Sequence, residues 1–268
     1  MIRATIGIFS QGGGFDADAQ AFFDRVTTAG GSLSTTEQEA VNTLVLDMKD
    51  DGIWTKMKAI YPMVGASAAA CAQNLKSSSF TGAFTSGWTF ASTGVTPNGT
   101  SAYMDTGLNL STQTTLYNVA YSNYIRTLSS TGIDMGVTKS PTYTQEGWLA
   151  SNLGGFLYGG FYNNDEGGIK VATTNSRGFF VSSVTSNTNQ FVSQQNVIKG
   201  TRLSTNTTTP ANTTIVLGGV KDENGGSVIA FTNKETCFAS ISDGLSTTEA
   251  SNFYTAVQAF QTTLSRQV

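Results

Sequence analysis

The sequence contains no histidine, and this absence excludes more chemistry than any other feature of its composition. Ser-His-Asp and Cys-His nucleophile systems, histidine-containing zinc or iron sites and the usual general base near neutral pH all require that residue. The two cysteines, Cys71 and Cys237, lack CxxC spacing, so a thiolate zinc site or a redox centre is disfavoured. A disulfide between them stays open, but two buried thiols are the simpler expectation.

Charge and long apolar runs are also scarce. Only 12% of the 268 residues are charged, the net charge is −3, and about a quarter are serine or threonine, which predicts a neutral, hydroxyl-rich surface. No Lys/Arg cluster offers a footprint for nucleic acid or an anionic membrane. No window has the apolar length of a membrane span, and the first residues are too polar for a signal peptide. We therefore expect neither nucleic acid nor membrane as a partner.

The C-terminal stretch is the most informative part that is present. Cys237 to Ile241 form a short run typical of a buried strand, and Asp243-Gly244 then supplies a turn. Ser246 and Glu249 have the spacing of a capping box, so a helix is expected from Thr247. Its apolar residues recur at helical spacing on one face, and we expect this face to pack against a sheet. These residues are Ala250, Phe253, Tyr254, Val257, Phe260 and Leu264.

Two further helices are predicted near the N-terminus. Asp16 is a suitable cap for the first, and Ser34 with Glu37 repeats the capping box for the second, which Gly52 ends. The repeated LSTTE pentapeptide indicates reuse of a good cap rather than a duplicated domain. Residues 15–60 are accordingly expected to form a helical hairpin that precedes the main domain.

Between Ala72 and Phe238 the pattern is one of short β-prone runs separated by turn residues, without a long helix. The runs are 115–125, 168–172, 179–184 and 214–220. Such a pattern favours a mainly β protein with an antiparallel sandwich. We expect three parts: an arm and glycine joint over 1–14, the hairpin over 15–60, and the sandwich with its C-terminal helix over 61–268.

Catalysis is not expected. Glycosidases on sandwich folds need two carboxylates that face one groove, often at alternate positions of one strand. The Glu37-x-Glu39 pair falls in a predicted helix, and the adjacent acids Asp165-Glu166 and Asp222-Glu223 fall in turns. No catalytic residue is therefore assigned, and no cofactor is expected.

Two kinds of binding site remain as candidates. Asp165, Glu166 and Asp222 could offer oxygen ligands to Ca²⁺, although their spacing matches no known calcium loop and they also suit ordinary hydrogen-bonded turns. Aromatic residues could stack on sugar rings, or they could equally belong to the core. The candidate glycan-binding aromatics are Trp88, Trp148, Tyr158 and Tyr162.

The N-terminal segment is β-prone and is separated from the first helix by Gly12 to Gly14. It is either a disordered tip or an arm that pairs with a neighbouring subunit in a homo-oligomer. Its apolar side chains are the candidate anchors to a partner. These are Ile2, Ile6, Ile8 and Phe9.

Three stretches resemble a known family: GWTFASTGVTPNGTSAYMDTGLN over 87–109, NSRGFFV over 175–181, and the closing FASISDGLSTTEASNFYTAVQAFQTTLSRQV. They are similar to concanavalin-like, laminin-G-like jelly-roll domains of tailed-bacteriophage virion proteins, and the similarity covers nearly everything after Gly14. The resemblance implies two curved antiparallel sheets. The acid pair of the enzymatic glucanase members is absent here, which argues against catalysis but not against the fold.

Two functions are therefore expected. The first is a non-enzymatic structural component of a virion, such as a capsid decoration or tail-fibre protein, that contacts other virion proteins and is assembled in the host cytoplasm. The second is a carbohydrate-binding or glycan-degrading protein of the same fold, and a host-surface glycan could also be the partner of the first.

Overall fold

The computed structural model describes residues 14–141, 146–161, 168–203 and 209–268. The helices are α1 (Ala17–Thr28), α2 (Thr35–Asp50), the short 3₁₀ helix η1 (Trp54–Lys56), α3 (Ala68–Cys71), α4 (Leu110–Gln113) and α5 (Thr247–Thr263). One sheet contains β1 (Met57–Tyr61), β3 (Trp88–Ala91), β4 (Gly94–Pro97), β6 (Val119–Ile125), β11 (Gly178–Ser186), β12 (Asn189–Gln194), β13 (Val197–Arg202) and β17 (Thr236–Ser242). The other contains β2 (Ala83–Phe84), β5 (Met104–Asn109), β7 (Met135–Thr138), β8 (Gly147–Leu153), β9 (Phe156–Phe161), β10 (Ile169–Ala172), β14 (Thr214–Leu217), β15 (Val220–Asp222) and β16 (Val228–Ile229).

The two sheets form a sandwich, which confirms the predicted mainly β fold. The first sheet has eight strands in the order β13-β12-β11-β6-β17-β4-β3, with β1 also paired to β17. The second has nine strands, with the order β10-β9-β8-β7-β14-β5-β2 and β15-β16 attached beside β7. All strand pairings within the described residues are antiparallel except β15 with β7. Residues from both sheets fill the space between them, including Tyr121, Leu149, Leu157, Phe161 and Phe180.

The predicted C-terminal strand is β17, and it lies in the interior of the eight-stranded sheet. It pairs with β6 on one side and with β1 and β4 on the other. All seven of its residues are buried. Both thiols are buried and free, as the simpler expectation had it: Cys237 on this strand and Cys71 on α3.

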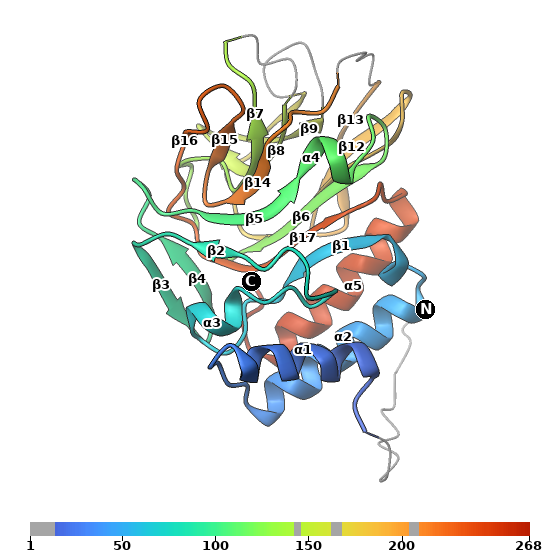
Figure 1. Ribbon diagram of the computed structural model, residues 1–268. Coiled ribbons are helices and arrows are strands. Elements are labelled where there is room, and N and C mark those ends of the chain that lie inside the picture. The colour runs from blue at the N-terminus through green and yellow to red at the C-terminus, as the bar shows by residue number, and fades with distance from the viewer. Residues whose placement is uncertain (1–13, 142–145, 162–167, 204–208) are drawn as a thin grey trace.

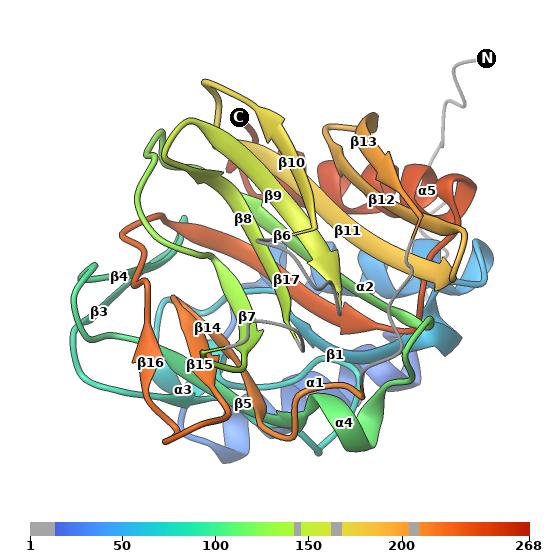
Figure 2. The same cartoon turned by 90° about the horizontal axis from the view of Figure 1, so that it is seen from above.

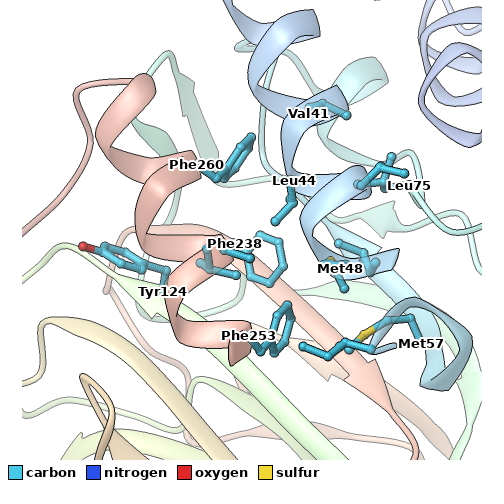
Figure 3. Close-up of a cluster of buried hydrophobic side chains, with 14 of the residues drawn as sticks. Val41, Leu44, Met48, Met57, Leu75, Tyr124, Phe238, Phe253 and Phe260 are labelled. Carbon is cyan, nitrogen blue, oxygen red and sulfur yellow. The ribbon is translucent and has the colours of Figure 1, made fainter. Parts of the chain in front are cut away.

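Three helices cover the outer face of the eight-stranded sheet (Figure 1). Side chains of α1, α2 and α5 form one hydrophobic cluster with outward-facing residues of β6, β11 and β17. In α5, the ring of Phe253 meets Phe179 of β11 edge to face, with centroids 5.3 Å apart, and lies 5.8 Å from Phe238 of β17. Figure 3 shows Phe253, Phe260 and Phe238 converging on side chains of α2. The predicted helical face is thus buried against a sheet.

Both predicted capping boxes are present. The Ser34 hydroxyl accepts the Glu37 backbone amide, and the Glu37 carboxylate accepts the Ser34 amide at 2.8 Å. Ser246 and Glu249 make the same reciprocal pair at the start of α5. These bonds involve residues only three apart, which is why the sequence pattern located both helix starts.

Two strand boundaries differ from the expectation. The sheet begins at Met57 in β1, before Tyr61-Pro62, because this segment pairs with β17 rather than extending the helical hairpin. The run expected over 214–220 is divided into β14 and β15 because Gly218 has a φ of +92°, which is outside the extended region. Among the described residues, no helix has the length and apolar character needed to cross a membrane.

Candidate glycan-binding face

The outer face of the nine-stranded sheet carries a row of aromatic side chains. Successive residues of a strand point to opposite faces, and Leu149 of β8 and Leu157 of β9 point into the core between the sheets. Their neighbours Trp148 and Tyr158 point outward and join a separate, smaller cluster with Ile133, Ala150 and Val220. Figure 2 shows β8, β9 and β10 in front of the other sheet, with the helices behind it.

Three rings form this row. The Trp148 and Tyr158 centroids are 5.3 Å apart at an interplanar angle of 39°, and those of Phe156 and Tyr158 are 6.1 Å apart at 60°. Trp148 is only 8% exposed, whereas Tyr158 and Phe156 are half-buried. Trp148 is therefore the buried member of the row and packs against Tyr158, whereas the Tyr158 and Phe156 rings are partly exposed to solvent.

A lysine lies over the outer end of the row. The Lys170 ammonium on β10 is 4.4 Å from the Phe156 ring centroid and 5.4 Å from that of Tyr158. Such distances are those of cation–π contacts, in which the ring faces attract the cation. Lys170 is exposed, so its ammonium also remains open to solvent and to a ligand above the rings.

The row ends at an open depression of about 660 Å³. Phe156 lies where the aromatic row meets the depression, because its neighbour Gly155 and its cross-strand partner Ala172 both line the depression. The full lining is Gly155, Ala172, Thr173, Thr174, Asn175, Gln194, Gln195, Val197 and Lys199. These side chains are mostly neutral hydrogen-bonding groups, with one cation and no carboxylate.

Two tight hairpin turns border the depression. Gly154 and Gly155, with φ of +59° and +92°, join β8 to β9. Gln195 and Asn196, with φ of +48° and +61°, join β12 to β13. Two consecutive residues with positive φ match the right-handed twist of a hairpin, so the backbone of both rims is fixed by the strands behind it.

Part of the polar lining is already engaged in holding the structure together. The Gln194 amide donates to the carbonyl oxygens of Asn175 and Arg177, each at 3.1 Å. Gln195 accepts from the Phe179 amide at 3.1 Å and donates to the Val268 carbonyl at 3.0 Å. The described part of the chain offers the Lys199 ammonium no hydrogen-bond partner, so that group is free to meet a ligand.

The structure brings together two of the four predicted aromatics and separates a third. Trp88 lies on β3 of the other sheet, where its ring meets Phe84 edge to face at 5.1 Å and packs against the core between the sheets. Tyr162 lies outside the described residues, as do Asp165 and Glu166 and the candidate anchors Ile2, Ile6, Ile8 and Phe9.

The remaining calcium candidate, Asp222, is engaged in a turn. One carboxylate oxygen accepts the backbone amides of Ser140 and Asn224, each at 3.0 Å, and the other accepts the Ser140 hydroxyl. Burial opposes ionisation of this carboxyl, but these hydrogen bonds outweigh it and lower its pKa. Among the described residues, no group of three or more histidine, cysteine, aspartate or glutamate side chains could hold a metal ion.

Phe156, Lys170 and Lys199 were missed by the sequence reading. A local signal for Phe156 exists, since Gly154-Gly155 indicates a hairpin turn and Phe156 shares the face of Tyr158 two residues on. No local signal links Lys199 to Phe156, because they belong to strands of different sheets.

Comparison with known proteins supports the fold. No family model matches the sequence, and no curated protein matches it significantly. The structure is similar to domain 4 of AbnA, an extracellular GH43 arabinanase of Geobacillus stearothermophilus solved with arabinotriose, with a TM-score of 0.51 and 13% identity over 74% of this chain and 98% of that one. It is also similar to the Trypanosoma rangeli sialidase in complex with sialic acid, with a TM-score of 0.51 and 8% identity over 81% of this chain.

The chain spans only 39% of the length of the sialidase. At these identities the likeness establishes a shared β-sandwich fold and no more. Neither of these two structures supports the expected virion role.

Proposed function

We propose that this protein is a carbohydrate-binding β-sandwich module that holds a glycan on the outer face of its nine-stranded sheet without cleaving it. The observation that carries the proposal is the row of Trp148, Tyr158 and Phe156 that leads into the polar depression. The apolar faces of sugar rings match aromatic rings, while hydroxyl and amide groups beside them fix orientation. This favours the second expected function, in its binding form.

The comparisons support the same proposal by analogy. Domain 4 of the arabinanase was solved with arabinotriose, and 98% of that domain matches 74% of this chain. All three rings lie on two adjacent, paired strands, and contacts built on strands are held more precisely than contacts on loops.

Hydrolysis is not part of the proposal. Cleavage of a glycosidic bond requires two carboxylates on opposite sides of the bond. The nine residues that line the depression include no aspartate or glutamate. The site offers the contacts of a binding surface rather than those of an acid–base pair.

Oligosaccharide binding to the purified protein tests the proposal, with calorimetry or affinity electrophoresis as the readout across neutral and acidic glycans. Tyr158→Ala and Phe156→Ala should each weaken binding by about two- to tenfold, the value of one aromatic contact. Tyr103→Ala serves as the control, because Tyr103 is also half-buried but lies outside the site. Equal affinities in all three variants, or no binding to any glycan, would refute the proposal.

A further inference from the structure

Among the described residues, only three basic side chains are exposed: Lys170, Arg177 and Lys199. Every other described lysine or arginine is at least partly buried. Because only 12% of the residues are charged, the location of the three exposed cations is informative.

Two of the three, Lys170 and Lys199, lie at the proposed binding site, and the backbone of Arg177 lies beside it. Lys170 covers the Phe156 ring at 4.4 Å, and Lys199 lines the depression. Arg177 lies in the segment between β10 and β11, and its carbonyl is held by Gln194, which lines the same depression. Strands β10 and β13 belong to different sheets and contact one another here, so Lys170 and Lys199 lie on neighbouring strands.

These cations also lack acidic partners within the described parts of the chain. Most other described basic residues form ion pairs with N···O distances from 2.6 to 3.0 Å. The paired residues are Lys49, Lys56, Lys58, Arg126, Lys139, Lys221 and Lys234. Between positions 147 and 221 the sequence has only two acids, Asp165 and Glu166, and both lie outside the described residues. The binding face therefore carries local positive charge on a protein whose net charge is −3.

From this charge distribution we infer that the ligand is an acidic saccharide. Its carboxylates meet Lys199 and Lys170, whose exposed side chain swings off the Phe156 ring, while its sugar rings lie on Tyr158 and Phe156. The inference rests on the proposed function and names its ligand class. A net negative protein has no general attraction for anions, so a preference for the acidic form must come from this face. Charge-assisted hydrogen bonds from unpaired ammonium groups supply it.

Matched probes that differ only in charge separate this effect from sugar recognition. Oligogalacturonate and its methyl-esterified form are one pair, and sialyllactose and its sialic acid methyl ester are a second. For at least one pair, calorimetry at low salt should show the acidic form binding about fivefold or more tighter, given two surface ion pairs of ordinary strength. Added NaCl should reduce that difference, because it screens exposed charges. The pair that responds identifies the type of acidic sugar.

The double variant Lys170→Gln with Lys199→Gln should abolish the preference while leaving the neutral probe bound. Both side chains are exposed, so an unchanged thermal midpoint is expected. Lys58→Gln, compared with Lys199→Gln alone, is the charge-matched control, because Lys58 lies on β1 and pairs with Asp243 at 2.9 Å, away from the site. Loss of the preference in the control as well would show a general charge effect and overturn the inference.

The outcomes also distinguish this inference from the proposed function. Equal binding of both members of each pair by the unaltered protein would overturn the acidic-sugar inference and leave glycan binding in place. No binding of any saccharide would refute the proposed function, and the inference would fall with it.

Discussion

The two outer faces of the sandwich are made of similar antiparallel strands but differ in what lies on them. The eight-stranded sheet is covered by α1, α2 and α5, whose side chains form a continuous apolar layer with Tyr124, Phe179 and Phe238. The nine-stranded sheet has only a small cluster around Trp148, and partly exposed aromatic rings at its margin. Aromatic residues therefore serve stability on one face and stay partly exposed on the other, where we propose that they contact a ligand.

The difference lies in burial rather than in residue type. Phe253 is fully buried between rings of two strands, whereas Phe156 keeps contact with solvent and carries a lysine on its face. The hydrophobic contribution of a ring scales with the area removed from water. The same substitution on the two faces should consequently have very different effects.

The largest effect is expected from Phe253→Ala. Removal of a fully buried phenylalanine should reduce the free energy of unfolding by about 3 to 5 kcal/mol, measured by urea denaturation. Phe156→Ala on the open face should cost less than about 1 kcal/mol. Similar losses in the two variants would show that both faces contribute equally to stability.

A smaller effect is expected at the start of α5, the helix that closes the covered face. Ser246→Ala removes the hydroxyl that accepts the Glu249 amide and should cost about 1 kcal/mol. Ser251→Ala within the same helix is the control and should be nearly neutral, because alanine is at least as good a helix former. An unchanged thermal midpoint in Ser246→Ala would contradict the role assigned to the cap.

The smallest effect concerns pH. Burial alone would raise the pKa of the Glu249 carboxyl, but hydrogen bonds from Lys56 and from the Ser246 amide outweigh it and hold that pKa below 4.5. A carboxyl whose pKa is lower in the folded state stabilises the fold above its unfolded pKa, and the contribution is lost as the pH falls through the folded value. The free energy of unfolding should thus decrease as the pH falls below 4.5.

Glu249→Gln tests whether this contribution belongs to the covered face. The variant should be less stable than the unaltered protein near neutral pH, and the difference should shrink in acid. A difference in stability that stays constant down to low pH would contradict the assignment.

Much of the architecture could be predicted because its determinants are local. The capping boxes of Ser34 and Ser246 join residues three positions apart, and the stripe that includes Phe253 and Phe260 repeats at the period of a helix. The alternation of short β-prone runs and turns likewise indicated a sandwich. Each of these patterns is complete within one element or its immediate neighbours.

The candidate site could be predicted only in fragments. Sequence reasoning selected Trp148 and Tyr158 as aromatics, but it placed Trp88 beside them as an equal candidate and did not select Phe156, Lys170 or Lys199. Trp88 packs against the core of the sandwich, because strand β3 pairs with β4 at the opposite end of the other sheet. The residues next to Trp88 and Trp148 in the sequence do not indicate that the first packs against the core and the second lies on the outer face.

By itself, then, the sequence determined the helix starts, the apolar faces and the class of fold, since hydrogen bonds and periodicity act over a few residues. Only the tertiary structure decided which sheet face the helices cover and which rings and cations meet. Lys170 and Lys199 lie on edge strands of different sheets, and they reach one site because the sheets pack together there. Such long-range pairing depends on how whole strands are ordered, and no short stretch of sequence contains that order.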